Sequence, residues 1–132
     1  ACCGSTPFDR SFREVLSQLF PDHPLAPIPV THELFSDAVG HDVRRVRRRS
    51  IENAGPNAPL AANVQIVEPL IEGIEIDGRF VVLYSKYDIS CALERQATLS
   101  CEGYLPEDAV KLATNIVLYA MQQDIRLPEA KP

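Results

Sequence analysis

The sequence contains no tryptophan and a single methionine, and aromatic residues make up only 7% of its 132 residues. No apolar run approaches the ~20 residues that a membrane-spanning helix needs, so we expect no transmembrane segment. Acidic residues outnumber basic ones: the sequence has 18 Asp and Glu and 13 Lys and Arg, which gives a net charge of −5. Proteins that bind nucleic acid generally neutralise phosphates with an excess of Lys and Arg. We therefore expect no nucleic-acid partner.

The length leaves no room for two ordinary domains, and the composition does not favour disorder. Hydrophobic residues make up 45% and charged residues 23% of the chain, both near the average of globular domains. We predict a single α/β domain over residues 1–126. The polar, proline-containing residues 127–132 are predicted to form a flexible tail.

Two segments are predicted as helices. The first covers residues 6–20, with Thr6 as the cap, Pro7 at the first helical position and Asp9 completing a capping box. Its apolar residues recur at helical spacing and predict one apolar face, made of Phe8, Phe12, Val15, Leu16, Leu19 and Phe20. The second helix begins at Pro106, and its predicted buried face consists of Ala109, Leu112, Ala113, Ile116, Val117, Ala120 and Met121.

Strands are predicted between these helices. Asp77-Gly78 is a typical two-residue hairpin turn, so part of the sheet should be antiparallel. Thr31 is predicted to cap a short helical turn that Gly40 closes. Prolines and glycines predict loops over 21–30 and 50–63, and 85–104 is predicted to be irregular. The predicted strands cover residues 41–49, 64–67, 70–76 and 79–84.

The four cysteines leave several uses open. No CxxC pair is present, so the usual zinc-knuckle spacing is absent, and we expect no metal and no cofactor. The adjacent Cys2 and Cys3 are poorly placed to bond to each other. Cys91 and Cys101 could form a disulfide in an oxidising compartment. The alternatives are buried thiols, a catalytic thiol or a composite metal site.

The segment Cys2-Cys3-Gly4-Ser5 precedes the first predicted helix. A thiol at a helix N-terminus has a lowered pKa and is a better nucleophile, which makes Cys2 and Cys3 candidate catalytic residues. Backbone N–H groups at the same place could hold an oxyanion or a phosphate. The alternative interpretation is a tight turn whose small residues let the chain enter the helix.

Other candidate groups follow the last predicted strand. Asp88, beside Tyr87 and shortly before Cys91, lies where ligand sites gather in α/β sheets, although an Asx turn explains it equally well. Histidines 23, 32 and 41 could act as bases or could cap and pack. The arginines within residues 44–49 could bind phosphates or an acidic partner, or could pair with carboxylates on a solvated strand.

Several motifs in order resemble the bacterial domain-of-unknown-function family 4159, over residues 1 to about 122. They are Cys-Cys-Gly-Ser at 2–5, Phe-Asp-Arg-Ser-Phe at 8–12, Phe-Pro-Asp-His-Pro-Leu at 20–25, His-Glu-Leu-Phe at 32–35, Glu-Gly-Ile-Glu-Ile-Asp-Gly-Arg at 72–79, Tyr-Ser-Lys-Tyr-Asp at 84–88, Ser-Cys-Ala-Leu-Glu at 90–94 and Gly-Tyr at 103–104.

The resemblance implies a class I glutamine amidotransferase-like domain, of which this chain would be the C-terminal part. The implied fold is a partial flavodoxin-like three-layer sandwich with a mixed sheet and an antiparallel hairpin. Amidotransferases pair a nucleophilic cysteine with a His-x-Glu after a later strand. Residues 84–88 fall at that place and contain no histidine, so glutaminase activity is not expected.

We therefore expect a non-catalytic module that binds an unknown small ligand or a protein. The resemblance points to the bacterial periplasm or cell envelope. Incomplete sheets would leave open edges through which the chain could form a homo-oligomer. The alternative is a cysteine-dependent hydrolase that uses Cys2 or Cys3 at a degenerate nucleophile elbow, with Asp88 as a third catalytic candidate. The expected ligand-binding residues are Cys3, Gly4, Ser5, Asp9, Arg10, Tyr87, Asp88 and Cys91.

Overall fold

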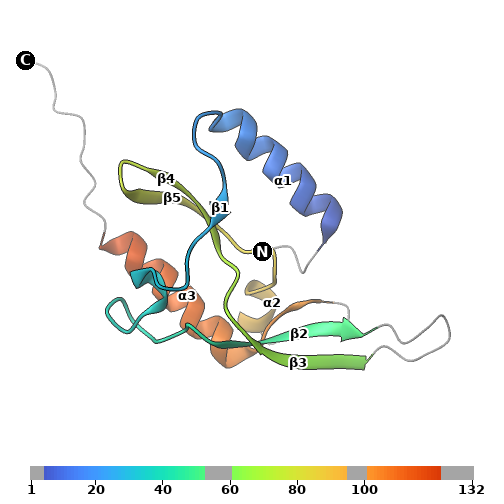
Figure 1. Cartoon of the computed structure of the whole chain (residues 1–132). Helices are drawn as coiled ribbons and strands as arrows, with labels where there is room; N and C mark the ends of the chain where they lie inside the picture. Colours follow the sequence, from blue (N-terminus) through green and yellow to red (C-terminus); the bar gives the residue numbers. More distant parts are fainter. Residues whose placement is uncertain (1–4, 53–60, 95–100, 123–132) are drawn as a thin grey trace, which may run out of the picture.

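The computed structural model describes residues 5–52, 61–94 and 101–122, and these form a mixed α/β arrangement (Figure 1). Within them lie three α-helices, a 3-10 turn and two small antiparallel sheets. No described helix is long and apolar enough to span a bilayer. The predicted tail lies outside the described residues. The elements are α1 (Thr6–Leu19), β1 (Ala26–Pro27), η1 (Glu33–Phe35), β2 (Val46–Glu52), β3 (Ala61–Val67), β4 (Glu72–Ile76), β5 (Arg79–Tyr84), α2 (Ser90–Leu93), β6 (Gly103–Tyr104) and α3 (Pro106–Met121).

The two sheets have three strands each, in the orders β1-β4-β5 and β3-β2-β6. The predicted hairpin is confirmed: β4 pairs antiparallel with β5, and Asp77 and Gly78 both adopt positive φ, at 54° and 75°. Positive φ at both central residues is what a tight type I′ turn requires. Residues 68–71 carry the chain from β3 into β4 and so connect the two sheets (Figure 1).

The core lies between α3, the η1 segment and the sheets. Phe35 is fully buried, and Leu34, Ile71 and Leu112 are each 1% exposed. The buried face of α3 differs from the predicted one, because Val117 and Met121 are exposed while Asn115 and Tyr119 are buried. The core cluster contains Ile28, Leu34, Phe35, Val39, Val43, Val46, Ile71, Ala92, Tyr104, Ala109, Leu112 and Tyr119.

Asn115 connects α3 to the η1 segment. Its side-chain oxygen accepts a hydrogen bond from the His41 N–H at 2.8 Å, and its amide nitrogen donates to the carbonyl oxygens of Leu34 and His41, both at 2.8 Å. The side chain is only 1% exposed, so these three bonds satisfy the polar atoms of Asn115 inside the protein. Gly40 is needed beside it, since a Cβ there would lie 2.6 Å from the Asn115 oxygen.

Helix α1 begins with Pro7 in its first turn, as predicted, but two other predictions for it are wrong. Ser5 occupies the cap position without a side-chain cap bond, and Thr6 is already helical, so the predicted capping box does not form. Only Leu16 is buried, whereas Phe8 and Leu19 of the predicted apolar face are exposed. The helix stands beside the sheet β1-β4-β5 (Figure 1).

Several predicted boundaries also shift. β2 begins at Val46 rather than at residue 41, and β3 begins at Ala61, inside the predicted loop. The cap of η1 is His32, whose Nδ1 accepts a hydrogen bond from the Leu34 N–H, and not Thr31. α2 and β6 form within the stretch predicted to be irregular, because Asp88 and Gly103 bring its described parts together.

Candidate functional site

Two polar clusters contain the candidate carboxylates, one at the end of β5 and one in the segment that follows it. The first, which we call the α1 cluster, consists of Asp9, Arg13, Glu72 and Tyr84. The second, the Asp88 cluster, consists of Asp88, Ser90, Cys91 and Cys101. The candidate residues Asp9 and Asp88 therefore have different hydrogen-bond partners.

The α1 cluster joins helix α1 to both strands of the β4-β5 hairpin. Both terminal nitrogens of Arg13 donate to the carboxylate of Glu72, with Nη1 to Oε1 at 2.9 Å, and its Nε donates to Asp9 Oδ2 at 3.0 Å. The Tyr84 hydroxyl donates to the other oxygen of Asp9 at 2.8 Å. A bidentate bond between arginine and carboxylate fixes direction as well as charge. The helix is therefore held in one orientation.

The electrostatics of this cluster are those of a closed network. The hydrogen bond from Arg13 lowers the pKa of Asp9, the Tyr84 hydroxyl and the charge of Lys86 act in the same direction, and burial opposes them. The hydrogen bonds to Glu72 and Asp9 raise the pKa of Arg13. Each carboxylate thus already has hydrogen-bond partners within the cluster. A general acid or base needs a group that can exchange its proton near neutral pH, so this cluster is suited to structure.

Replacing Asp9 by asparagine is expected to remove part of the acid sensitivity of folding. Since the folded pKa of Asp9 is depressed, its contribution is present above the unfolded value near 4 and is lost as the pH falls through the folded pKa. At pH 7 we expect a loss of about 1 kcal/mol, a modest figure because Arg13 is partly exposed. Urea unfolding at pH 7 and pH 3 measures it.

The matched control is Asp22→Asn, since Asp22 is exposed. The control should leave both unfolding midpoints in place, and the Asp9→Asn deficit should shrink at pH 3. A deficit that is equal at both pH values would contradict the ionic explanation.

The Asp88 cluster is built on a buried carboxylate. Asp88 is 3% exposed, and its Oδ1 accepts hydrogen bonds from the Ser90 hydroxyl and the Cys91 N–H, each at 3.2 Å. Its Oδ2 accepts one from the Ala92 N–H, also at 3.2 Å. Both oxygens are therefore used to cap the N–H groups at the start of α2. The Asx-turn interpretation of Asp88 accounts for these contacts.

The backbone of Asp88 is fixed as tightly as its side chain. Its N–H donates to the Glu102 carbonyl at 3.0 Å, and its carbonyl accepts from the Tyr104 N–H at 3.1 Å. These bonds form a parallel bridge between Asp88 and Gly103, where a Cβ would lie 2.7 Å from the Asp88 Cβ and carbonyl oxygen. The close approach explains why glycine occupies position 103.

Two sulfur atoms lie beside this carboxylate. The sulfurs of Cys91 and Cys101 and an oxygen of Asp88 all lie within 4.8 Å of one another. Cys101 is disulfide-bonded, whereas Cys91 is in no disulfide, so the Cys91–Cys101 bridge considered from the sequence is not the one present. The negative charge of Asp88 raises the pKa of the Cys91 thiol, and burial adds to this effect.

The same three residues are the ones that the described part of the chain offers to a metal ion. The Cys101 sulfur is already bonded, which leaves one thiol and one carboxylate. Zinc sites use three or four protein ligands, so this pair does not fit one.

The arginines within residues 44–49, which we call the arginine row, contact several different partners. Arg47 bonds the carboxylates of Asp108 and Glu107, at 3.1 and 3.0 Å, and Arg48 lies 3.9 Å from the ring centroid of Tyr87. Arg49 donates to the Cys101 carbonyl. These contacts favour the predicted strand whose arginines find partners within the protein, and they tie Tyr87 to β2.

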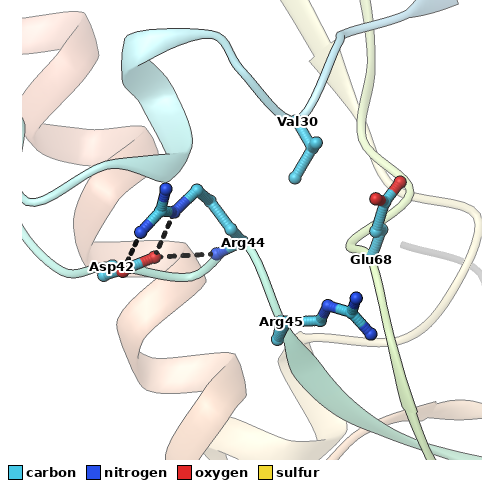
Figure 2. Close-up of a pocket in the computed structure, with 5 residues that line it drawn as sticks. All are labelled: Val30, Asp42, Arg44, Arg45 and Glu68. Carbon is cyan, nitrogen blue, oxygen red and sulfur yellow. Dashed lines mark hydrogen bonds and ion pairs between the residues drawn. The ribbon is translucent and has the colours of Figure 1, made fainter.

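An open depression of about 370 Å³ lies beside the start of this row. Figure 2 shows Arg44 turned back onto Asp42, while Arg45 extends toward the segment that carries Glu68. The bonds from Arg44 lower the pKa of Asp42 to about 2. Two cations and two anions line the depression, so it has no net charge with which to select phosphates.

The remaining candidates are placed as follows. His32 packs edge-on against Phe80 and Tyr119, with ring centroids 5.1 and 5.8 Å apart, while its Nδ1 caps η1. Ser5, at the cap of α1, and Arg10, on the helix itself, are exposed. The other candidates, Cys2, Cys3 and Gly4, lie outside the described residues.

Sequence reasoning missed Arg13, Glu72 and Tyr84 as members of a cluster. One signal was present, because Arg13 follows Asp9 by four residues and such pairs meet on a helix. Glu72 gave a second signal as a carboxylate next to apolar strand residues. Its partner is 59 residues away in the sequence, so the pairing itself was not visible.

The described elements define a mixed α/β domain whose polar clusters serve chiefly as internal connections. The chain matches the family model of a domain of unknown function (DUF4159) over residues 1–121, and it belongs to this family, as its motifs predicted. Comparison with curated proteins and with solved structures finds no match.

Proposed function

We propose that this chain is a non-catalytic binding module for a small ligand or a protein, within a bacterial envelope-associated assembly. We also propose that its elements belong to an amidotransferase-like three-layer sandwich and that the chain is the C-terminal part of that domain. The motif resemblance supports both statements, and the absence of a histidine at residues 84–88 supports a role without glutaminase chemistry.

The observation that carries the proposal is the state of the Asp88 cluster. A catalytic thiol needs a neighbour that lowers its pKa, such as a histidine or a helix N-terminus. Cys91 has a carboxylate beside it, which raises the pKa instead. The carboxylate itself accepts three hydrogen bonds that hold α2. The described contacts of the cluster therefore hold α2 in place and provide no group that activates Cys91.

A hydrolysis assay tests this proposal against the cysteine-dependent hydrolase. Purified protein is incubated with glutamine and with an aryl ester, alongside Cys2→Ser, Cys3→Ser and Cys91→Ser variants. We expect equal background rates for all four proteins. Turnover that disappears in Cys2→Ser or Cys3→Ser would overturn the proposal and identify the nucleophile.

A thiol-reactivity measurement checks the electrostatic part separately. At pH 7 we expect Cys91 to react with iodoacetamide more slowly than a thiol in an unstructured peptide, because less of it is thiolate. Glu94 also raises this pKa, so Glu94→Gln should accelerate labelling without disturbing the bonds of Asp88. Glu33→Gln, on η1, is the matched control and should change nothing. Peptide mass mapping assigns the label to each cysteine.

A further inference from the structure

Strand β3 forms one edge of the sheet β3-β2-β6, and within the described part of the chain no strand pairs with its outer side. In Figure 1 it runs along the margin of the molecule, beside β2. An open strand edge presents N–H and C=O groups that can pair with another chain. Proteins usually protect such edges with charges, proline, short length or a covering segment.

The other sheet edges in the described residues have protection of this kind. β1 is only two residues long, and one of them is proline. At β5, the Phe80 N–H already donates to the Tyr119 hydroxyl of α3, and β6 is bridged to Asp88 on the side away from β2. β3, in contrast, has seven residues without a charge, a proline or a glycine. It is therefore the edge best suited to pairing.

The backbone groups of β3 that point outward follow from its pairing with β2. Arg47 lies opposite Ile66, but its carbonyl accepts from the Leu105 N–H at 3.0 Å and its N–H donates to Asp108 at 2.6 Å. Opposed residues in an antiparallel ladder exchange either both backbone bonds or neither, so this pair exchanges neither. The N–H and C=O of Ile66 thus point away from β2. Those of Val64, two residues earlier, do the same.

The side chains of this edge are apolar and exposed. Val64 is 50% exposed and Ile66 is 69% exposed, and residues two apart on a strand lie on the same face. Gln65, between them, is also exposed and lies on the opposite face. The middle of β3 therefore offers two outward backbone positions with apolar side chains, placed evenly on either side of Gln65.

We propose that two copies of this chain pair antiparallel through β3, so that Val64 of one copy lies opposite Ile66 of the other. The two Gln65 residues then face each other on the two-fold axis. Each Val64–Ile66 pair exchanges two backbone hydrogen bonds, and the two pairs are equivalent by symmetry. The four apolar side chains meet on one face, where cross-strand pairs stabilise a sheet. The two sheets become one continuous sheet.

The distribution of charge favours a second copy as the partner. Like charges directly opposite each other destabilise a strand pair, and β3 has none to place there, although the chain as a whole has a net charge of −5. The arginines of the two β2 strands would be separated by three strand spacings, about 14 Å, which exceeds the screening length of about 8 Å. Pairing uses the open edge of each copy, so the association stops at a dimer.

Sedimentation velocity of the purified full chain tests the proposal. Thiols are first blocked with iodoacetamide so that no disulfide can join two copies. A small interface of this kind gives micromolar or weaker affinity, so between about 5 and 500 µM the mass should rise from 14.6 kDa toward twice that value. A monomer over the whole range would overturn the proposal.

Substitutions on β3 locate the interface. Ile66→Lys should remain monomeric over the same range, because it places a charge in the interface at a position that the single chain leaves exposed. Ile66→Pro should also remain monomeric, since it removes an N–H that points outward and no bond to β2. The matched control Val81→Lys changes an exposed valine of β5 and should dimerise as the unchanged protein does. Circular dichroism checks the fold of each variant.

A mixing experiment tests the register. Val64→Lys and Ile66→Glu should each be monomeric alone, and an equimolar mixture should form a dimer, because residue 64 of one copy lies opposite residue 66 of the other. Undiminished association in Ile66→Lys and Ile66→Pro would place the contact elsewhere and overturn the proposal. A mixture that stays monomeric while the unchanged chain dimerises would overturn the proposed pairing of Val64 with Ile66.

Discussion

Replacing Asn115 by aspartate is expected to destabilise the protein by about 3–5 kcal/mol at pH 7, the range found when a buried charge loses its partner. The amide nitrogen of Asn115 donates to the carbonyl oxygens of Leu34 and His41. Aspartate would direct a carboxylate oxygen at those two acceptors in a position that is 1% exposed. The shape of the side chain hardly changes, so the loss reports hydrogen bonding and charge rather than packing.

The loss of stability in Asn115→Asp should depend on pH. Burial next to two carbonyl oxygens raises the pKa of the new carboxyl above its unfolded value near 4. The deficit therefore grows as the pH rises from 4 toward the folded pKa, by up to about 1.4 kcal/mol per pH unit. Urea unfolding at pH 4, 5.5 and 7 measures it.

Gln122→Glu serves as the matched control, because it makes the same change from amide to acid at the exposed C-cap of α3. We expect it to cost less than about 1 kcal/mol, from the unfavourable charge at a helix C-terminus. Equal losses for the two variants, or an Asn115→Asp deficit independent of pH, would show that Asn115 does not make the buried contacts described above.

Gly103→Ala is expected to be the second most damaging change, with a loss of about 1–3 kcal/mol. The added Cβ would lie 2.7 Å from the Asp88 carbonyl oxygen and 3.1 Å from its Cα. These are backbone atoms held by hydrogen bonds to Glu102 and Tyr104, so they cannot rotate away as a side chain would. The bridge between β6 and the segment before α2 must open instead.

Comparison with Gly78→Ala separates the steric cost of the added Cβ at position 103 from the cost of a strained backbone conformation. Gly78 has no atom within 4 Å of its added Cβ but adopts φ of 75°, so alanine there costs about 1–2 kcal/mol through conformation alone. Only Gly103→Ala should also change the labelling rate of Cys91, because it displaces Asp88. Normal labelling in Gly103→Ala together with full stability would mean that the bridge is not formed in solution.

The elements that the sequence predicted correctly are those set by neighbouring residues. Pro7 and Pro106 begin α1 and α3, and Asp77-Gly78 turns the hairpin, because each acts through its own backbone preference. The buried face of α3 was wrong because an apolar count ignores Asn115, which is buried by partners more than 70 residues away. Burial of a polar group depends on such long-range partners, which periodicity does not reveal.

The candidate site was predictable to a similar extent. The place of Asp88 after a strand, and its role in a turn, followed from local chemistry. The partners of Asp9 on the hairpin did not, since they depend on how α1 lies against the hairpin. Arg13 decides that placement by bonding to Glu72, and the sequence alone does not pair two residues so far apart.

Helix α1 has few buried apolar side chains, and its described ring contact with the hairpin is between Phe12 and Tyr84. It buries only Leu16, and its described side-chain bonds to the hairpin come from Arg13 and Asp9. Segments held by few buried contacts open in small excursions that cost less than global unfolding. The backbone amides of α1 should thus exchange with deuterium before those of α3, and the helix would behave as a separate cooperative unit. The core that contains Leu112 and Phe35 would remain packed while α1 is detached.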